Sequence, residues 1–325
     1  MSKAIRISHT GGPEVLEWVD VPEREPAAGE VRIRNHAVGL NYIDIYFREG
    51  VYPVPALPAG LGMEGAGVIE ATGAGVDTFK VGDRVAYGQG PLGAYAEQHY
   101  VPAAKVIALP DDIDFETAAA VMLKGLTVQY LFRQTYPLQS GQTILFHAAA
   151  GGVGLIACQW AKALGVKLIG TVSSPEKAAL AKQNGAWETI NYKQENIVER
   201  VRELTDGARV PVVYDSVGKD TWLTSLDCLQ TRGLMVSYGN TTGPVDGINI
   251  GILNQKGSLY ATRPSLAGYA DTRPRYEAMC SELFDMLSSG AIKVDINQRY
   301  PLADAARAQQ ALASGQTTGS TVLLP

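Results

Sequence analysis

The sequence has few of the residues from which disulfide frameworks and metal sites are built. It contains three cysteines and four histidines among 325 residues. The cysteines are odd in number, far apart and set in helix-like surroundings, so we expect buried free thiols rather than a disulfide framework. Each histidine stands alone among strand-like residues, with no ligand motif or paired carboxylate, which favours structural roles. These residues are Cys158, Cys228, Cys280, His9, His36, His99 and His147.

Charge and long apolar runs are also scarce. Charged residues make up 19% of the chain and the net charge is −5, which disfavours nucleic acid or an anionic membrane as a partner. His147, Lys124 or glycines interrupt the longest apolar stretches well before membrane-spanning length. The N-terminus MSKAIRISHT lacks the apolar core of a secretory signal. We therefore expect a cytoplasmic protein with no membrane partner.

The remaining composition is typical of a globular protein with more than one domain. Hydrophobic residues make up 46% of the chain, which is enough to bury a sizeable core. A chain of 325 residues exceeds the size at which a single core stops growing, so we expect two domains.

The chain divides into three regions by pattern. Residues 1 to about 120 carry short β-like runs and turn signals, such as VRIRNHAVGL and AYAEQHYV, which predict a mostly antiparallel, barrel-like domain. From about 125 to 260, strands such as TILFHA, KLIGTV and VPVVYDSV alternate with helical segments, which predicts a doubly wound parallel sheet of the α/β class. The tail carries helices near Arg275 to Ser289 and Ala303 to Ser314 and the strand STVLL, which we expect to return to the first domain.

A glycine-rich stretch in mid-chain, HAAAGGVGLIACQWAKALG, follows the strand-like run TILF and opens a helical pattern. Its spacing, Ala148-x-x-Gly151-x-x-Gly154, is a variant of the dinucleotide-binding fingerprint. Small residues there give a tight turn and let a pyrophosphate approach the backbone, while the helix N-terminus offers free N–H groups to the phosphates. The stretch therefore predicts a nucleotide-binding site.

The next strand, KLIGTV, favours NADP(H) over NAD(H) as the cofactor. An NAD site usually has an acidic residue at the end of this strand to bind the ribose 2′-OH, but here the chain continues T-V-S-S-P-E-K. Ser173 and Lys177 suit a 2′-phosphate instead. Glu176 and Lys177 also fit a solvated first helical turn capped by Ser174, with Pro175 at its first position, whatever else Lys177 does.

Several motifs resemble, in order along the chain, the zeta-crystallin-like NADPH:quinone oxidoreductases. These form a zinc-free branch of the medium-chain dehydrogenase/reductase superfamily. The motifs are GGPEVL, GLNYIDIYFREGVYP, GMEGAGVI, FKVGDRV, LKGLTVQYL, HAAAGGVG and YDSVG. The resemblance implies a GroES-like catalytic domain (1–124), a Rossmann NADPH-binding domain (125–262) and a return to the catalytic domain (263–325), with the active site in the cleft between them.

The resemblance also implies which residues form the site. Asn41 and Tyr46 are expected near the nicotinamide and Tyr52 at the substrate mouth, and these three are the catalytic candidates. Tyr46 or Tyr52 is suited to steady an oxyanion or relay a proton, because a phenol both donates and accepts; the alternative is that either ring only packs. The expected cofactor-binding residues are Asn41, Asp44, Tyr46, Lys124, Thr127, Tyr130, Gly151, Gly152, Val153, Ser173, Lys177, Tyr192, Ser216, Gly239, Asn240, Ser265 and Leu266.

The superfamily's zinc enzymes give a contrast. Where they carry metal-binding cysteines and a histidine, this chain has Asn41, Met63 and the Lys124-Gly125 step. Singly, Met63 is also plausible core filler and Asn41 a turn residue, but together they argue against a catalytic zinc. We therefore expect no metal.

The expected activity is hydride transfer from NADPH to a quinone small-molecule substrate, with proximity as the main catalytic effect. Two alternatives stay open: reduction of the activated double bond of an alkenal or enone, and a non-catalytic NADPH-binding, RNA-associated role. The resemblance also implies a homodimer paired through the nucleotide domains, with GSLYAT, Gly257 to Thr262, as an apolar edge strand.

Overall fold

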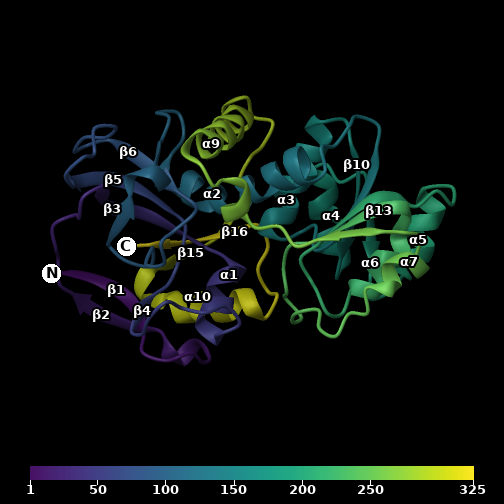
Figure 1. Cartoon of the computed structure of the whole chain (residues 1–325), viewed down its shortest axis with the longest axis horizontal. Coiled ribbons are helices and arrows are strands. Elements are labelled where there is room, and N and C mark those ends of the chain that lie inside the picture. The colour runs from purple at the N-terminus through teal and green to yellow at the C-terminus, as the bar shows by residue number, and fades with distance from the viewer. The chain divides into compact units, whose positions relative to one another are not determined.

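The structure is a computed structural model that describes all residues from 1 to 325, and the chain forms two compact units (Figure 1). Unit 1 comprises Met1–Leu126, Ala270–Gly290 and Val294–Pro325, and unit 2 comprises Thr127–Tyr269 and Ala291–Lys293. The sequence-based boundaries fall after residues 124 and 262, whereas the units change after residues 126 and 269.

Unit 1 contains two sheets in which most neighbouring strands run antiparallel, as the sequence predicts. Strands β2-β1-β4 form one sheet, and the other runs β15-β16-β3-β5-β6-β8 with β7 paired to β3. Only β15 and β16 pair in parallel in this unit. The strands are β1 (Ser2–Ile7), β2 (Glu17–Val21), β3 (Glu30–Leu40), β4 (Ala59–Gly60), β5 (Gly65–Thr72), β6 (Arg84–Tyr87), β7 (Gln98–Pro102), β8 (Ile107–Ala108), β15 (Ile296–Pro301) and β16 (Ser320–Leu324).

Strand β3 shows how the pattern of residues builds the core of unit 1. Val31 and Ile33 are buried, while the arginines between and after them are more exposed, as the two-residue period of a strand requires. Asn35 continues the buried face, and its polar atoms are satisfied there. Its amide donates to the carbonyl oxygens of Ala94 at 3.1 Å and Ala96 at 2.8 Å. The hydroxyl of Tyr87 donates to its Oδ1 at 2.8 Å.

The helices of unit 1 include one that the sequence analysis missed. Tyr46 lies in this helix, α1, which ends where Gly50 takes a left-handed φ of 79°. Tyr52 does lie in a loop. The helices are α1 (Tyr42–Glu49), α2 (Phe115–Tyr130, continuing into unit 2), α9 (Arg273–Ser288) and α10 (Ala305–Ala313), with short 3-10 turns at Pro13–Val15, Ala103–Lys105 and Leu302–Asp304.

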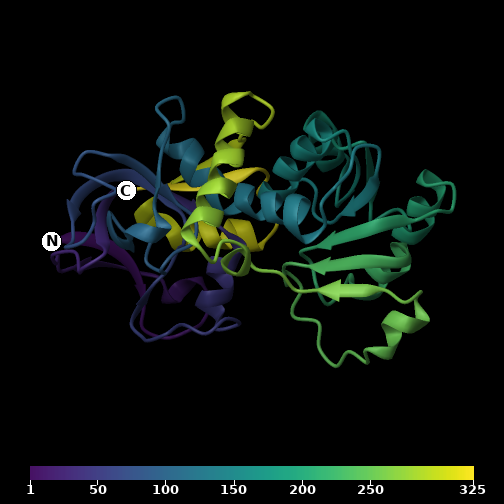
Figure 2. The same cartoon turned by 45° about the horizontal axis from the view of Figure 1, so that its top comes forward.

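Unit 2 is a doubly wound parallel sheet, which confirms the predicted fold class. Its strand order is β11-β10-β9-β12-β13-β14, and every pair is parallel. Figure 2 shows β13 and β14, in green, side by side and pointing the same way. The strands are β9 (Thr143–Phe146), β10 (Lys167–Val172), β11 (Glu188–Asn191), β12 (Val210–Asp215), β13 (Leu229–Ser237) and β14 (Tyr260–Thr262). The helical segments are η3 (Leu131–Thr135), α3 (Gly152–Ala163), α4 (Pro175–Gln183), α5 (Ile197–Leu204), α6 (Trp222–Cys228), α7 (Gly251–Gln255) and α8 (Leu266–Tyr269).

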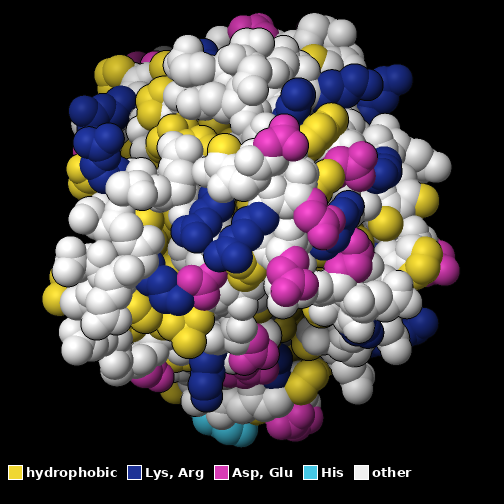
Figure 3. Space-filling model, turned by 90° about the vertical axis from the view of Figure 1, so that its right-hand side faces the viewer, with side chains coloured by type: hydrophobic (Ala, Val, Ile, Leu, Met, Phe, Trp, Pro, Cys, Tyr) yellow, Lys and Arg dark blue, Asp and Glu magenta, His cyan; other side chains and the backbone are white.

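The state of the cysteines and the mixture of charges on the surface are those expected from the composition. Cys158, Cys228 and Cys280 are buried free thiols, as predicted, and they lie in α3, α6 and α9. Figure 3 shows the face at the right of Figure 1, where lysine and arginine side chains are interspersed with aspartate and glutamate. None of the helices is both long enough and apolar enough to cross a bilayer.

Candidate cofactor and substrate site

The glycine stretch forms the predicted turn between β9 and α3. Gly151 is the residue before the helix, with a φ of −80°, and α3 begins at Gly152. Ala148 takes a left-handed φ of 56°, which is unusual for a residue with a side chain. Gly154 lies against the backbone of the turn, where a larger residue does not fit. The first N–H groups of α3, including those of Gly152 and Val153, have no partners within the helix, and such groups at a helix N-terminus are able to bind anions.

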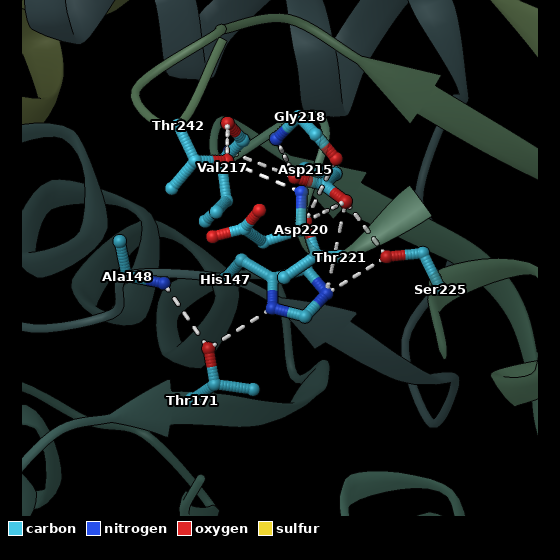
Figure 4. Close-up of polar contacts among 10 residues, drawn as sticks. All are labelled: His147, Ala148, Thr171, Asp215, Val217, Gly218, Asp220, Thr221, Ser225 and Thr242. Carbon is cyan, nitrogen blue, oxygen red and sulfur yellow. Dashed lines mark hydrogen bonds and ion pairs between the residues drawn. The ribbon is translucent and has the colours of Figure 1, made fainter. Parts of the chain in front are cut away.

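The turn is joined to a buried polar network at the carboxyl ends of three strands (Figure 4). The N–H of Ala148 donates to Thr171 Oγ1 at 3.2 Å, and that hydroxyl lies 3.1 Å from His147 Nδ1. On the other side of the ring, His147 Nε2 lies 2.9 Å from Ser225 Oγ, and the Ser225 hydroxyl donates to Asp215 Oδ2 at 2.7 Å. The network therefore links β9, β10 and β12 to α6.

The network fixes the state of the histidine. Because Ser225 gives its only hydroxyl proton to Asp215, its oxygen accepts from His147, which places the ring proton on Nε2. Nδ1 then accepts from the Thr171 hydroxyl. Burial lowers the pKa of His147, so the ring is neutral and its 4.0 Å approach to Asp215 is not an ion pair. Asp215 is joined to His147 through the Ser225 hydroxyl and not as a directly paired carboxylate.

Asp215 is held by more donors than Ser225 alone. Its Oδ1 accepts the N–H groups of Val217 at 2.7 Å and Gly218 at 3.0 Å. The Thr221 hydroxyl donates to Oδ2 at 2.7 Å. This buried carboxylate thus has the donors that a charge away from water requires.

The segment after β10 has the helix cap that the sequence predicts. Ser174 caps α4 by accepting the N–H of Lys177 at 3.3 Å, and Pro175 occupies the first helical turn. Strand β10 ends at Val172 and is followed by Ser173, with no acidic residue at the strand end. The cap uses the backbone of Lys177 rather than its ammonium, so it is compatible with a phosphate role for that side chain.

The other residues expected at the cofactor lie after neighbouring strands of unit 2. Tyr192 follows β11 and is exposed, and Ser216 follows β12. Gly239 and Asn240 come shortly after β13. Because all these strands are parallel, their carboxyl ends lie along one edge of the sheet, where open α/β sheets bind ligands. Ser265 and Leu266 lie at the start of α8, and Leu266 is buried.

In unit 1, the candidate residues gather at the start of α1. Asn41 precedes the helix, and its N–H donates to Asp44 Oδ2 at 2.9 Å. The Tyr95 hydroxyl donates to the same oxygen at 2.8 Å. Asp44 is fully buried, and this burial raises the pKa of its carboxyl to about 7. By accepting the hydrogen bonds of Asn41 and Tyr95, the Asp44 side chain holds the start of α1 in place.

Glu64 is a buried carboxylate beside Asn41 that the sequence analysis did not select. Its Oε2 accepts from Asn41 Nδ2 at 2.6 Å and lies 3.4 Å from Lys124 Nζ. Its Oε1 accepts the N–H of Leu123 at 2.6 Å. The sequence signal that could have identified Glu64 is a charged residue within the apolar, glycine-rich run GLGMEGAGVI. Glu64 brings together two of the predicted site residues, Asn41 and Lys124.

Aromatic rings cluster next to these residues in unit 1. Tyr46 and Tyr52 contact edge to face, with ring centroids 5.2 Å apart. The ring centroids of Tyr42 and Tyr46 are 5.4 Å apart, and those of Phe47 and Tyr52 are 5.7 Å apart. The backbone also joins the loop to the helix, because the N–H of Tyr52 donates to the carbonyl oxygen of Tyr46 at 3.1 Å. The two catalytic tyrosine candidates thus belong to one aromatic cluster.

Helix α2 carries the remaining candidates. Lys124 is buried in unit 1, while Thr127 and Tyr130 belong to unit 2. The ring of Tyr130 stacks on that of Tyr269, with centroids 4.9 Å apart.

A catalytic zinc does not fit the residues that are present. No three His, Cys, Asp or Glu side chains gather closely enough to hold a metal ion. Asn41, Met63 and Lys124 offer an amide, a thioether and an ammonium, and an ammonium cannot be a ligand.

Known proteins match this chain along its whole length. The family model described as alcohol dehydrogenase GroES-like domain matches residues 27–111, and the one described as zinc-binding dehydrogenase matches residues 152–285. A quinone oxidoreductase of Pseudomonas aeruginosa is 66% identical over 325 residues, which are 100% of both chains. The chain belongs to the quinone oxidoreductase family. The resemblance inferred from the motifs and the GroES-like and Rossmann folds are confirmed.

Solved structures and a further relative agree with this family. The crystal structure of an Escherichia coli quinone oxidoreductase complexed with NADPH is 56% identical, with a TM-score of 0.98, and covers 99% of this chain and 100% of that one. A 2-haloacrylate reductase of a Burkholderia species is 43% identical over 332 residues, covering 100% of this chain and 99% of its own.

Proposed function

We propose that the chain is an NADPH-dependent quinone reductase that transfers hydride without a metal. The observation that carries the proposal is the turn from β9 into α3, with Gly154 against its backbone and no acidic residue at the end of β10. Family membership supports it, because the most similar relatives described above are quinone oxidoreductases and one is complexed with NADPH. We take unit 2 as the cofactor domain and unit 1 as the catalytic domain.

Unit 2 supplies the groups that bind the cofactor. In this proposal the first N–H groups of α3 bind the pyrophosphate, and Ser173 and Lys177 bind the 2′-phosphate. Tyr192 packs beside the adenosine moiety. The remaining predicted contacts are Gly151, Ser216, Gly239, Asn240, Ser265, Leu266, Thr127 and Tyr130.

Unit 1 supplies the groups that receive the quinone. When bound, NADPH provides the hydride, and a proton completes the hydroquinone. We assign Asn41, Tyr46 and Tyr52 to the substrate side, where the aromatic cluster suits a flat, conjugated ring. Their amide and hydroxyl groups can donate to an oxygen on which negative charge develops. No Lewis acid is needed for a quinone, because reduction gives it an aromatic ring.

A comparison of substrates tests the proposal. The purified protein should oxidise NADPH with 1,4-benzoquinone and do so faster than with a matched panel of alkenals, enones and 2-haloacrylate. Faster turnover of the activated double bonds would replace the proposal with double-bond reduction. Absence of turnover with every acceptor, together with salt-dependent binding of single-stranded RNA, would indicate a non-catalytic role.

We also propose that the chain forms a homodimer through the edge of unit 2. Strand β14 pairs only with β13, and Tyr260 on it is 61% exposed. An exposed apolar edge is a pairing liability unless a partner covers it, and a second copy related by a two-fold axis would do so. Light scattering should give a dimer at micromolar concentration, and Tyr260→Glu should shift it toward monomer. A monomeric wild type would refute the assignment.

A further inference from the structure

We propose that Glu64 is a positioning residue for the quinone reductase reaction: its carboxylate keeps Lys124 protonated and fixes the orientation of the Asn41 amide. The inference rests on the function proposed above, which places Asn41 at the site, and on Lys124 as a predicted cofactor-binding residue. Glu64 lies within the motif GMEGAGVI, but the predicted site did not include it.

The hydrogen bonds of Glu64 define both effects. Asn41 Nδ2 and Lys124 Nζ approach the same oxygen, Oε2, at 2.6 Å and 3.4 Å. Because Nδ2 of Asn41 donates one of its two N–H groups to Glu64, the orientation of the amide is fixed. The N–H of Leu123 holds the other oxygen, Oε1, at 2.6 Å. One carboxylate thus ties the start of α1 to the middle of α2.

Burial makes this pair interdependent. The side chain of Glu64 is 0% exposed and that of Lys124 is 7% exposed. A buried charge without a partner costs several kcal/mol in general and usually neutralises instead. Below about pH 7, the neighbouring titratable groups cannot replace Glu64 as the counter-charge. Asp44, on α1, has a carboxyl whose pKa is raised, chiefly by burial. Burial also raises the pKa of Tyr87 and Tyr95, which stay neutral.

A second observation shows that the fold makes room for this carboxylate. A Cβ atom added to Gly39, near the end of β3, would lie 2.1 Å from Glu64 Oε2 and 2.1 Å from the carbonyl oxygen of Ala119. Real Cβ atoms do not approach so closely, so only glycine at position 39 lets the carboxylate reach its partners. The glycine of the GLNYID motif thus serves to admit Glu64.

The experiment compares wild type with Glu64→Gln, which keeps the shape and removes the charge. Lysines are labelled with ¹³C at Cε, and the Lys124 resonance is identified by its loss in Lys124→Met. The titration of this resonance in wild type is the reference. In Glu64→Gln it should titrate at least one pH unit lower, because the buried ammonium has lost its counter-charge.

The same change should appear in catalysis. The kcat/KM of Glu64→Gln for the quinone should be closest to the wild-type value at low pH. It should fall as the pH rises through the lowered titration of Lys124, since the proposal requires protonated Lys124 for turnover. The double variant Glu64→Gln, Lys124→Arg should lose this pH dependence, because a guanidinium does not deprotonate in this range. A merely structural role for Glu64 would lower activity equally at every pH.

A matched control is Glu70→Gln on β5, which breaks the ion pairs of Glu70 with Arg32 and Arg34 at a more exposed position. It should leave both the Lys124 titration and the pH profile as in wild type. An unchanged Lys124 titration in Glu64→Gln would overturn the inference. If Glu64→Gln fails to fold, Glu64→Asp should keep Lys124 protonated, and a lowered titration there would overturn it as well. The resonance is read without substrate, so a wild type inactive on quinones would refute the proposed function separately.

Discussion

A Cβ atom added to Gly154 would lie 2.4 Å from the carbonyl oxygen of Ala148. The same atom would lie 2.6 Å from the backbone of Ala149, so the start of α3 and the turn before it are in contact through their main chains. The closeness of strand and helix at this point sets the position of the N–H groups that we assign to the pyrophosphate.

Gly154→Ala should therefore weaken NADPH binding while the protein stays folded. The added methyl forces α3 away from the turn and displaces its first N–H groups. We expect at least a tenfold higher Kd for NADPH, about 1.4 kcal/mol or more, measured by fluorescence titration. An unchanged Kd would show that these N–H groups do not bind the cofactor.

Lys177→Ala should discriminate between the two nicotinamide cofactors. Loss of one partly exposed charge-assisted contact should weaken NADPH binding by roughly 1–2 kcal/mol and leave NADH binding nearly unchanged. The matched control is Lys182→Ala on the same helix, whose ammonium pairs with Glu188 at 2.8 Å. Dissociation constants are compared at one ionic strength. Parallel shifts for both cofactors would refute the phosphate role of Lys177.

Asp44 should make stability depend on pH. Burial raises the pKa of its carboxyl from 3.8 to about 7, so the folded state holds a proton that the unfolded state has released between these values. Its contribution is fully present below the unfolded value and is lost as the pH rises through about 7. The change in the free energy of unfolding is roughly 4 kcal/mol at most.

Asp44→Asn tests this dependence. The amide oxygen can still accept from Asn41 and Tyr95, but the side chain no longer titrates. Relative to wild type, the variant should gain in denaturant midpoint as the pH rises from about 4 to about 8. A constant difference across this range would mean that Asp44 is ionised in the folded protein throughout.

Ser225→Ala should destabilise the network at the carboxyl ends of the strands. It removes the bridge between His147 and Asp215 and leaves the buried N–H of His147 without an acceptor. We expect a loss of about 1–3 kcal/mol in unfolding free energy. The control is Ser288→Ala, which removes only an exposed hydrogen bond to Asp112 and should change the unfolding free energy by less than about 0.5 kcal/mol. Equal effects of the two substitutions would contradict the network as described.

The features that the sequence predicted correctly are those with local signals. The turn at Ala148 to Gly154 is marked by small residues between an apolar strand and a helical pattern, and the cap at Ser174 is followed at once by its proline. The alternation of strands and helices gave the parallel sheet for the same reason. Short β-like runs and turn signals predicted the antiparallel unit, and the family resemblance supplied the residues around Asn41.

What the sequence did not reveal depends on residues far apart along the chain. The bridge from His147 to Ser225 joins positions 78 residues apart, and the ion pair of Lys124 with Glu64 joins positions 60 residues apart. No periodicity records such contacts, since they exist only once the sheets have formed. Helix α1 was missed because its first residues, Tyr42 to Phe47, are mostly aromatic or β-branched, and such residues are weak helix formers.

The central claim is that this chain transfers hydride from NADPH to a quinone without a metal. The most direct measurement is the turnover of NADPH with 1,4-benzoquinone, under anaerobic conditions, before and after exhaustive dialysis against a strong chelator, with zinc content determined on the same samples. The account predicts unchanged turnover, a preference for NADPH over NADH, and zinc well below one atom per chain. Stoichiometric zinc whose removal abolishes turnover would contradict it.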